Sequence, residues 1–293
     1  MESRRLNYVP DKIPDPKKIP EGAEPVFQDV GESDHGIHYG LEERKEMTPE
    51  KRERYDWQMT KLTSMMNESG AWWQLHGGNT IDVVQIEKGG DYVGRHADID
   101  VFVLRKDVEK LEEFFRAKGY GLFLKLWTED RSRRVFRRVS AKDYRRGQGG
   151  LPHVLEIDER GRAKKDEDQL WKIQMDPIDI AEDGSMVDIF DEAGHLPKEW
   201  TEGRTVNFHG QEMHICHPAR YLAYKIRSEE RGYHDKDIDR LANLGVLTLQ
   251  DVDDLEDVAL TRLDKEQDEE KRAIVTRRLQ RIRQIIQRNE QGA

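Results

Sequence analysis

The sequence predicts an α/β protein whose first part mixes helices with short strands and whose last part is all helical, with a boundary near residue 217. Three observations predict this organisation. Apolar residues recur at helical spacing before residue 70 and again between residues 106 and 118. Between residues 71 and 217, short apolar runs are separated by polar turns, as is typical of strands. From Pro218 onward, apolar residues recur every three or four positions.

The first helix is expected to begin at Thr48-Pro49, because threonine caps helix N-termini and proline is favoured at the first helical position. Gly70 is expected to end this helix. Its apolar residues lie at helical spacing: Tyr55, Met59, Leu62 and Met66. Residues 1–47 are rich in proline and charge and are expected to form an extended arm.

The middle of the chain predicts a short strand at 71–76, a helix beginning at Asn79, a glycine-rich loop at 88–94, a strand at 98–104 and an amphipathic helix at 106–118. Further strands are expected at 122–126, 135–139, 154–157, 170–175, 186–190, 206–208 and 213–216, with a hairpin turn at 207–211. Beyond Pro218, helices are expected at 221–226, 235–244 and 266–288.

Composition excludes several classes of protein. The 293 residues carry a formal net charge of −10, and an acidic surface argues against broad or sequence-specific DNA binding. A local basic stretch, residues 131–146, would suit an RNA partner. Cys216 is the only cysteine, so no internal disulfide is expected. The sequence has no signal-peptide pattern and no apolar run approaching the ~18 residues of a membrane span. A cytoplasmic protein without a membrane partner is therefore expected.

The most informative feature is the pair Asp98 and Asp100 within the predicted strand at 98–104. Residues two apart on a strand point to the same face, so the two carboxylates are expected to project side by side. Ile99, Val101 and Val103 would point into a core on the other face. Two close like charges favour a cation between them, and Mg²⁺ is usually held by one or two carboxylates together with substrate phosphates.

A glycine pair, Gly77-Gly78, follows a predicted strand and precedes a predicted helix. Glycine lets the backbone approach an anion closely, and a helix N-terminus offers amides and positive partial charge. A triphosphate is therefore expected to lie there. Arg95 and His96, just before the aspartates, are expected to meet phosphate oxygens.

A third carboxylate on a neighbouring strand is expected to complete the metal site or accept a proton from the acceptor hydroxyl. Asp188 is the first choice, because it lies on a short predicted strand between two apolar neighbours. Glu156 is the reserve, and Asp176 and Asp179 stay open.

Two segments, His-Gly-Gly-Asn-Thr-Ile-Asp at 76–82 and Arg-His-Ala-Asp-Ile-Asp at 95–100, resemble the nucleotidyltransferase superfamily. The branch that modifies lincosamide and aminoglycoside antibiotics is the most similar, with Asn79 standing where that pattern has tryptophan. Met-Val-Asp-Ile-Phe at 186–190 and Tyr-Lys at 224–225 also resemble this branch. The resemblance covers roughly residues 55–245.

The resemblance implies a small mixed sheet flanked by helices in a catalytic domain over residues 48–217, followed by a helical domain over 218–293. It implies transfer of a nucleoside monophosphate from an Mg²⁺-bound nucleoside triphosphate, with ATP expected, to the hydroxyl of a small molecule. Asp98, Asp100 and Asp188 would hold metal, and Lys225 would reach the nucleotide phosphates. The alternatives are a toxin of the same fold that modifies RNA or protein, and a nucleotide-binding module without turnover.

Overall fold

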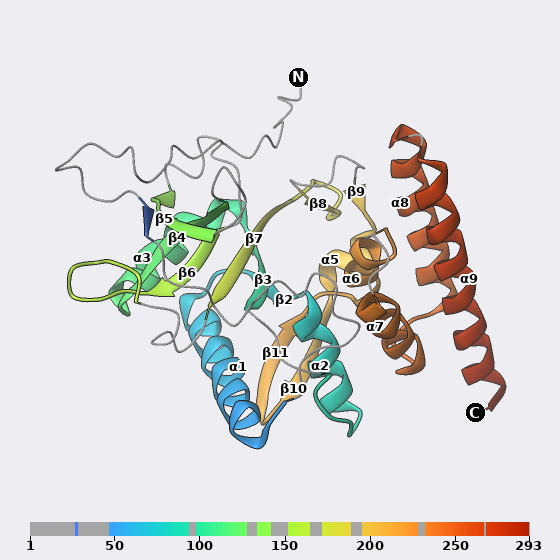
Figure 1. Ribbon diagram of the computed structural model, residues 1–293, viewed down its shortest axis with the longest axis horizontal. Coiled ribbons are helices and arrows are strands. Elements are labelled where there is room, and N and C mark those ends of the chain that lie inside the picture. The colour runs from blue at the N-terminus through green and yellow to red at the C-terminus, as the bar shows by residue number, and fades with distance from the viewer. Residues whose placement is uncertain are drawn as a thin grey trace.

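The computed structural model describes residues 27–28, 47–93, 98–127, 134–141, 152–164, 172–188, 195–227, 232–266 and 268–292. It has a mixed β-sheet with helices packed on both faces (Figure 1). The predicted α/β class is therefore confirmed. Strands β4, β5 and β6 lie at one side of the molecule, and the C-terminal helices lie at the other (Figure 1).

The sheet order is β1-β5-β4-β6-β7-β3-β2-β11-β10. Outside this order, β8 pairs with both β7 and β9. The β3–β7 and β2–β11 pairs are parallel, and the other pairs are antiparallel. The strands are β1 (Phe27–Gln28), β2 (Trp73–Leu75), β3 (Ile99–Leu104), β4 (Tyr120–Trp127), β5 (Arg134–Arg138), β6 (Pro152–Glu156), β7 (Ile173–Ile180), β8 (Met186–Asp188), β9 (His195–Leu196), β10 (Arg204–Phe208) and β11 (Gln211–Ile215).

The helices are α1 (Pro49–Ser69), α2 (Gly78–Glu87), α3 (Val108–Ala117), α5 (Lys198–Glu202), α6 (Pro218–Lys225), α7 (Gly232–Asn243), α8 (Leu249–Glu266) and α9 (Glu269–Gly292). The predicted ends of α1 are confirmed. The Thr48 side chain accepts a hydrogen bond from the Lys51 amide, and Gly70 closes the helix in the left-handed conformation with φ 61°.

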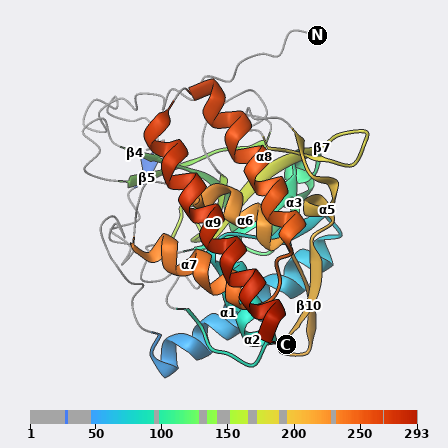
Figure 2. The same cartoon turned by 90° about the vertical axis from the view of Figure 1, so that its right-hand side faces the viewer.

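Two hydrophobic clusters pack on the sheet. The first joins β3 residues such as Val101 and Val103 to apolar residues of α1 and α3. The second joins Phe102 and Ile178 of the sheet to Ile81 of α2 and to the apolar faces of α6, α7, α8 and α9. Figure 2 shows α8 and α9 as an outer layer over α6 and α7. The C-terminal helices are therefore part of the core that covers the sheet.

The structure differs from the sequence prediction in one strand and in two helices that were not predicted. Strand β7 begins and ends later than the predicted strand at 170–175, because its parallel ladder with β3 continues through Asp176 and Pro177. Helix α8, which was not predicted separately, begins at a capping box in which Thr248 and Asp251 bond each other's amides. The short helix α5 was also not predicted. The hairpin at 207–211 is confirmed, with His209 and Gly210 at positive φ.

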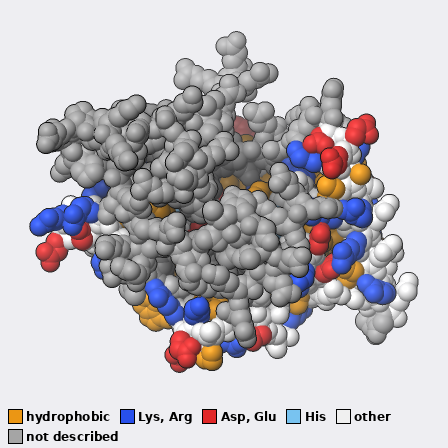
Figure 3. Space-filling view, in the orientation of Figure 1, with side chains coloured by type: hydrophobic (Ala, Val, Ile, Leu, Met, Phe, Trp, Pro, Cys, Tyr) orange, Lys and Arg blue, Asp and Glu red, His pale blue; other side chains and the backbone are white. Residues whose placement is uncertain are grey.

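Acidic and basic side chains are interspersed over the described surface in the view of Figure 3. In the described part of the chain, no helix combines the length and the apolar character needed to cross a bilayer.

Candidate active site

The two aspartates lie at the start of the central strand β3. Ile99 and Val101 are 3% and 0% exposed and belong to the first core cluster, whereas Asp98 and Asp100 are partly exposed. Side chains alternate along a strand, so the carboxylates lie on the face opposite that cluster. This arrangement agrees with the alternation expected from the sequence.

The glycine turn lies directly against Asp100. Gly77 follows β2 and precedes α2 with φ 70° and ψ −157°, a conformation that is essentially restricted to glycine. A Cβ atom at Gly77 would lie 2.2 Å from Oδ2 of Asp100. The amide of His76 also donates to the Asp100 carbonyl oxygen at 2.9 Å. The turn at the start of α2 therefore lies in direct contact with the side chain and backbone of Asp100.

Asn79, in the first turn of α2, contacts the backbone of both aspartates. Its Oδ1 accepts from the Asp100 amide at 3.3 Å, and its Nδ2 lies 3.5 Å from the Asp98 carbonyl oxygen. Its Nδ2 also donates to the Tyr55 hydroxyl at 2.6 Å. The Asn79 side chain is 1% exposed, so it forms hydrogen bonds with these protein groups and not with water.

A histidine and a carboxylate face each other across β3. The His76 ring stacks on Phe102 with centroids 3.8 Å apart and an angle of 7° between the planes. Its Nε2 lies 2.9 Å from Oδ2 of Asp176, although the N–H direction does not meet hydrogen-bond geometry. Gln174 donates to the other oxygen of Asp176 at 3.2 Å. The side chains of His76 and Asp176 are 14% and 18% exposed and so remain within reach of a ligand.

Sheet register places the candidate third carboxylates. Asp100 pairs with Gln174, and Phe102 pairs with Asp176, so Asp176 lies on the same face of the sheet as Asp100. The backbone of Asp188 pairs with Ile178, which in turn pairs with Leu104. The backbone of Asp188 is thus two strands away from β3. Along the strand direction it lies four residues beyond Asp100, which corresponds to about 13 Å at ~3.3 Å per residue.

The other two alternatives have different surroundings. Asp179 lies on the opposite face from Asp176 and pairs with Arg105 at 2.9 Å. Glu156 is 5% exposed and pairs with Lys164 at 3.1 Å. Arg95 and His96 lie outside the described residues, as does the side chain of Asp188.

Helix α6 brings a cation to the same face of the sheet. Arg220 is 6% exposed, and its guanidinium lies 5.3 Å from the centre of the Phe102 ring. Lys225, at the end of α6, is 8% exposed, and its Nζ lies 5.3 Å from the Tyr221 ring. The structure therefore brings Arg220 to Phe102, and it places the predicted phosphate ligand Lys225 beside an aromatic ring of its own helix.

A buried thiol lies between α6 and α2. Cys216 is 3.7 Å from the Thr80 hydroxyl, and burial raises the pKa of the thiol to about 11. The side chain is therefore a neutral thiol near neutral pH. His217 caps α6 through Nδ1, which accepts from the Ala219 amide at 3.3 Å, and burial lowers the pKa of this imidazole.

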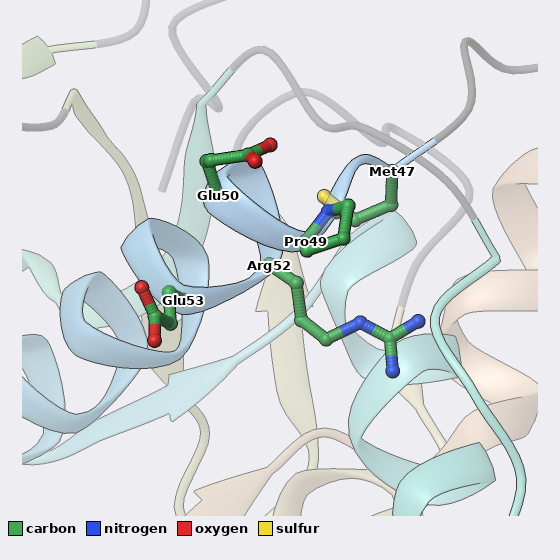
Figure 4. Close-up of a pocket in the computed structure, with 5 residues that line it drawn as sticks. All are labelled: Met47, Pro49, Glu50, Arg52 and Glu53. Atoms are coloured by element: carbon green, nitrogen blue, oxygen red, sulfur yellow. The ribbon is translucent and has the colours of Figure 1, made fainter.

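A shallow pocket lies at the start of α1 (Figure 4), lined by Met47, Pro49, Glu50, Arg52 and Glu53. Arg52 points away from the helix in this view and forms an ion pair with Asp91, and its guanidinium lies 5.6 Å from the Tyr92 ring centre. Tyr92 meets Tyr55 edge-on at 5.1 Å. The loop at 88–93 is therefore tied to α1 and, through the Tyr55 hydroxyl, to Asn79.

A hard cation bound at this site would have few protein ligands among the described residues. Among the residues whose side chains can be placed, no three acidic, histidine or cysteine side chains gather as a metal site. Asp98 and Asp100 would supply two carboxylates, and phosphate oxygens and water would supply the rest, as is usual for Mg²⁺.

Sequence reasoning gave no role to three residues of this site: His76, Asn79 and Arg220. The first two flank the glycine pair, and their position beside it was the available signal. Arg220 had no signal, because only the packing of α6 on the sheet brings it to Phe102.

The solved structures that are similar to this chain include an adenylyltransferase and a nucleotidyltransferase-like protein. The lincomycin-bound lincosamide antibiotic adenylyltransferase LnuA is 16% identical with a TM-score of 0.38, over 68% of this chain and 93% of that one. An antigenic nucleotidyltransferase-like protein from Paracoccidioides brasiliensis is 13% identical with a TM-score of 0.41, over 78% and 93%. No protein-family model and no curated protein sequence matches the chain.

Proposed function

We propose that the protein transfers a nucleoside monophosphate from a Mg²⁺-bound nucleoside triphosphate, with ATP as the expected donor, to an acceptor hydroxyl. The observation that carries this proposal is the contact between the Gly77 turn and the Asp100 carboxylate. A backbone suited to phosphate and a carboxylate suited to a cation lie side by side, which is what nucleotidyl transfer requires.

Asp98 and Asp100 would hold Mg²⁺, and Gly77 and Gly78 would hold the phosphates at the start of α2. When bound there, Mg²⁺ would neutralise charge on the reacting phosphates. Lys225 is proposed as a further phosphate partner. Arg220 is a second candidate, because it is a buried cation on the same face as the aspartates.

Asp176 is our preferred third acidic group, because its strand neighbours β3 and its side chain shares the face of Asp100. It would accept the proton of the acceptor hydroxyl as the hydroxyl oxygen bonds to the α-phosphorus and pyrophosphate leaves. Asp188 stays the alternative. Comparing Asp176→Asn with Asp188→Asn separates the two assignments, since only the true base is needed for turnover.

A small hydroxyl-bearing molecule is the proposed acceptor. The net charge of −10 disfavours a long nucleic acid, and the lone cysteine supports a reducing, cytoplasmic setting. RNA or protein as acceptor would identify the toxin alternative, and nucleotide binding without transfer would identify a binding module.

The test incubates the protein with α-labelled nucleoside triphosphates, Mg²⁺ and a cell extract, and follows label and pyrophosphate release. Label is expected in the small-molecule fraction, with loss of at least about 100-fold in Asp98→Asn. Asp107→Asn, at the start of α3, serves as the matched control. Equal release by Asp98→Asn and the wild type would reject the assigned site.

A further inference from the structure

We propose that Asn79 is a positioning residue that fixes the two aspartates of β3. Its side-chain amide holds the backbone on both sides of Ile99 and thereby determines where the carboxylates of Asp98 and Asp100 point. This inference rests on the proposed function of those carboxylates as metal ligands.

The amide of Asn79 takes the place of a neighbouring strand. The carbonyl of Asp98 and the amide of Asp100 point to one edge of β3, as do groups two residues apart in any strand. On that edge, the Asp100 carbonyl already accepts from the amide of His76 at the end of β2. The chain then turns away at Gly77, and Asn79 returns an oxygen to the Asp100 amide and a nitrogen to the Asp98 carbonyl.

The position of Asn79 is itself fixed. Its Nδ2 donates to the Tyr55 hydroxyl at 2.6 Å, and Tyr55 is 6% exposed and packed edge-on against Tyr92. A buried side-chain amide stabilises the fold only when both its oxygen and its nitrogen have partners, because a buried polar group without a partner costs its desolvation free energy. The amide is therefore held from α1 while it holds β3.

This arrangement joins the two halves of the site. Asn79 directly follows Gly78, so the residue that holds the aspartates belongs to the same turn that would hold the phosphates. Displacing β3 relative to α2 would separate the cation from the phosphates. Misplacement of reacting groups by ~1 Å can reduce rates about 100-fold.

The experiment compares Asn79→Leu, which removes both polar atoms, with Asn79→Asp, which keeps an oxygen for the Asp100 amide. Thr63→Val is the matched control, because it removes one buried hydrogen bond within α1 and touches neither aspartate. Hydrogen exchange of the Asp100 amide is followed by NMR, and turnover is measured as a function of Mg²⁺ concentration. Thermal unfolding confirms that each variant is folded.

In Asn79→Leu, we expect faster exchange at Asp100, a Mg²⁺ midpoint raised about tenfold and turnover reduced about 100-fold, with a nearly constant KM for the nucleotide. Asn79→Asp is expected to retain exchange protection at Asp100, and Thr63→Val to behave like the wild type. Unchanged exchange in Asn79→Leu, or changed exchange with an unchanged Mg²⁺ midpoint, would overturn the proposal. Absence of transfer by the wild type would instead reject the proposed function, and the exchange measurement would still test the contact.

Discussion

Replacing Gly77 with alanine tests whether the glycine turn and Asp100 form one site. The backbone of Gly77 has φ 70° and ψ −157°, so alanine would cost about 1–3 kcal/mol of stability from backbone strain alone. The new Cβ would lie 2.2 Å from Asp100 Oδ2, and real Cβ contacts are essentially never shorter than 3.0 Å. The carboxylate oxygen must therefore move by at least 0.8 Å.

The carboxylate oxygen can rotate away, but the added Cβ would also lie 3.0 Å from Cγ and 3.1 Å from Cβ of Asp100, so the side chain must also shift by a few tenths of an ångström. We expect this contact to affect activity more than folding. A displacement near 1 Å is expected to reduce turnover about 100-fold. Gly89→Ala is the matched control, because Gly89 has φ 79° and no atom within 4 Å of an added Cβ. It introduces backbone strain without touching Asp100. The assay combines denaturant unfolding with the rate of pyrophosphate release.

Both variants are expected to lose stability, and only Gly77→Ala is expected to lose turnover strongly. If Gly77→Ala were as active as Gly89→Ala, the carboxylate beside the turn would not take part in the reaction.

Four further outcomes follow from the structure. His76→Phe keeps an aromatic ring for stacking but removes the contact with Asp176, so turnover should fall by about 10- to 100-fold with little change in Tm. The raised pKa of Cys216 means that unfolding exposes a thiol that ionises more readily, so the free energy of unfolding should fall as pH rises from 9 toward 11, and Cys216→Ala should remove the contribution of this thiol to that fall. The lowered pKa of His217 means that the folded state favours neutral imidazole, so stability should fall as pH drops below the ordinary histidine value of about 6.5, and His217→Asn should flatten the dependence. Arg278 is 3% exposed and donates to the carbonyls of Lys225 and Ile226 at the end of α6, so Arg278→Leu leaves two buried acceptors unpaired and should reduce the free energy of unfolding by about 3 kcal/mol in a urea titration.

Local signals were sufficient for the elements that form the site. The ends of α1 follow from a threonine cap and a terminal glycine, and the face of Asp98 and Asp100 follows from strand periodicity. The start of α2 after Gly77 follows from a glycine pair between an apolar run and a helical pattern. Each of these features depends on residues a few positions apart.

Strand pairing could not be read in the same way. Whether Asp176 or Asp188 lies nearer Asp100 depends on the register of β7 against β3, which joins segments more than 70 residues apart. The parallel ladder also continues through Pro177, a residue that usually argues against a strand interior. Arg220 reaches Phe102 only because α6 packs on the sheet, and no local pattern encodes that contact.

The second hydrophobic cluster couples the stability of the aspartate strand to that of the C-terminal helices. Phe102, a residue of the aspartate strand β3, belongs to one buried cluster with Leu241, Leu255 and Ile282 of the C-terminal helices. Loosening of α8 or α9 would therefore remove packing from α6 and α7, and α6 carries the Arg220 side chain that lies over Phe102. We therefore expect partial unfolding of these outer helices, which are far from the carboxylates in sequence, to reduce turnover without any change in the residues of the site.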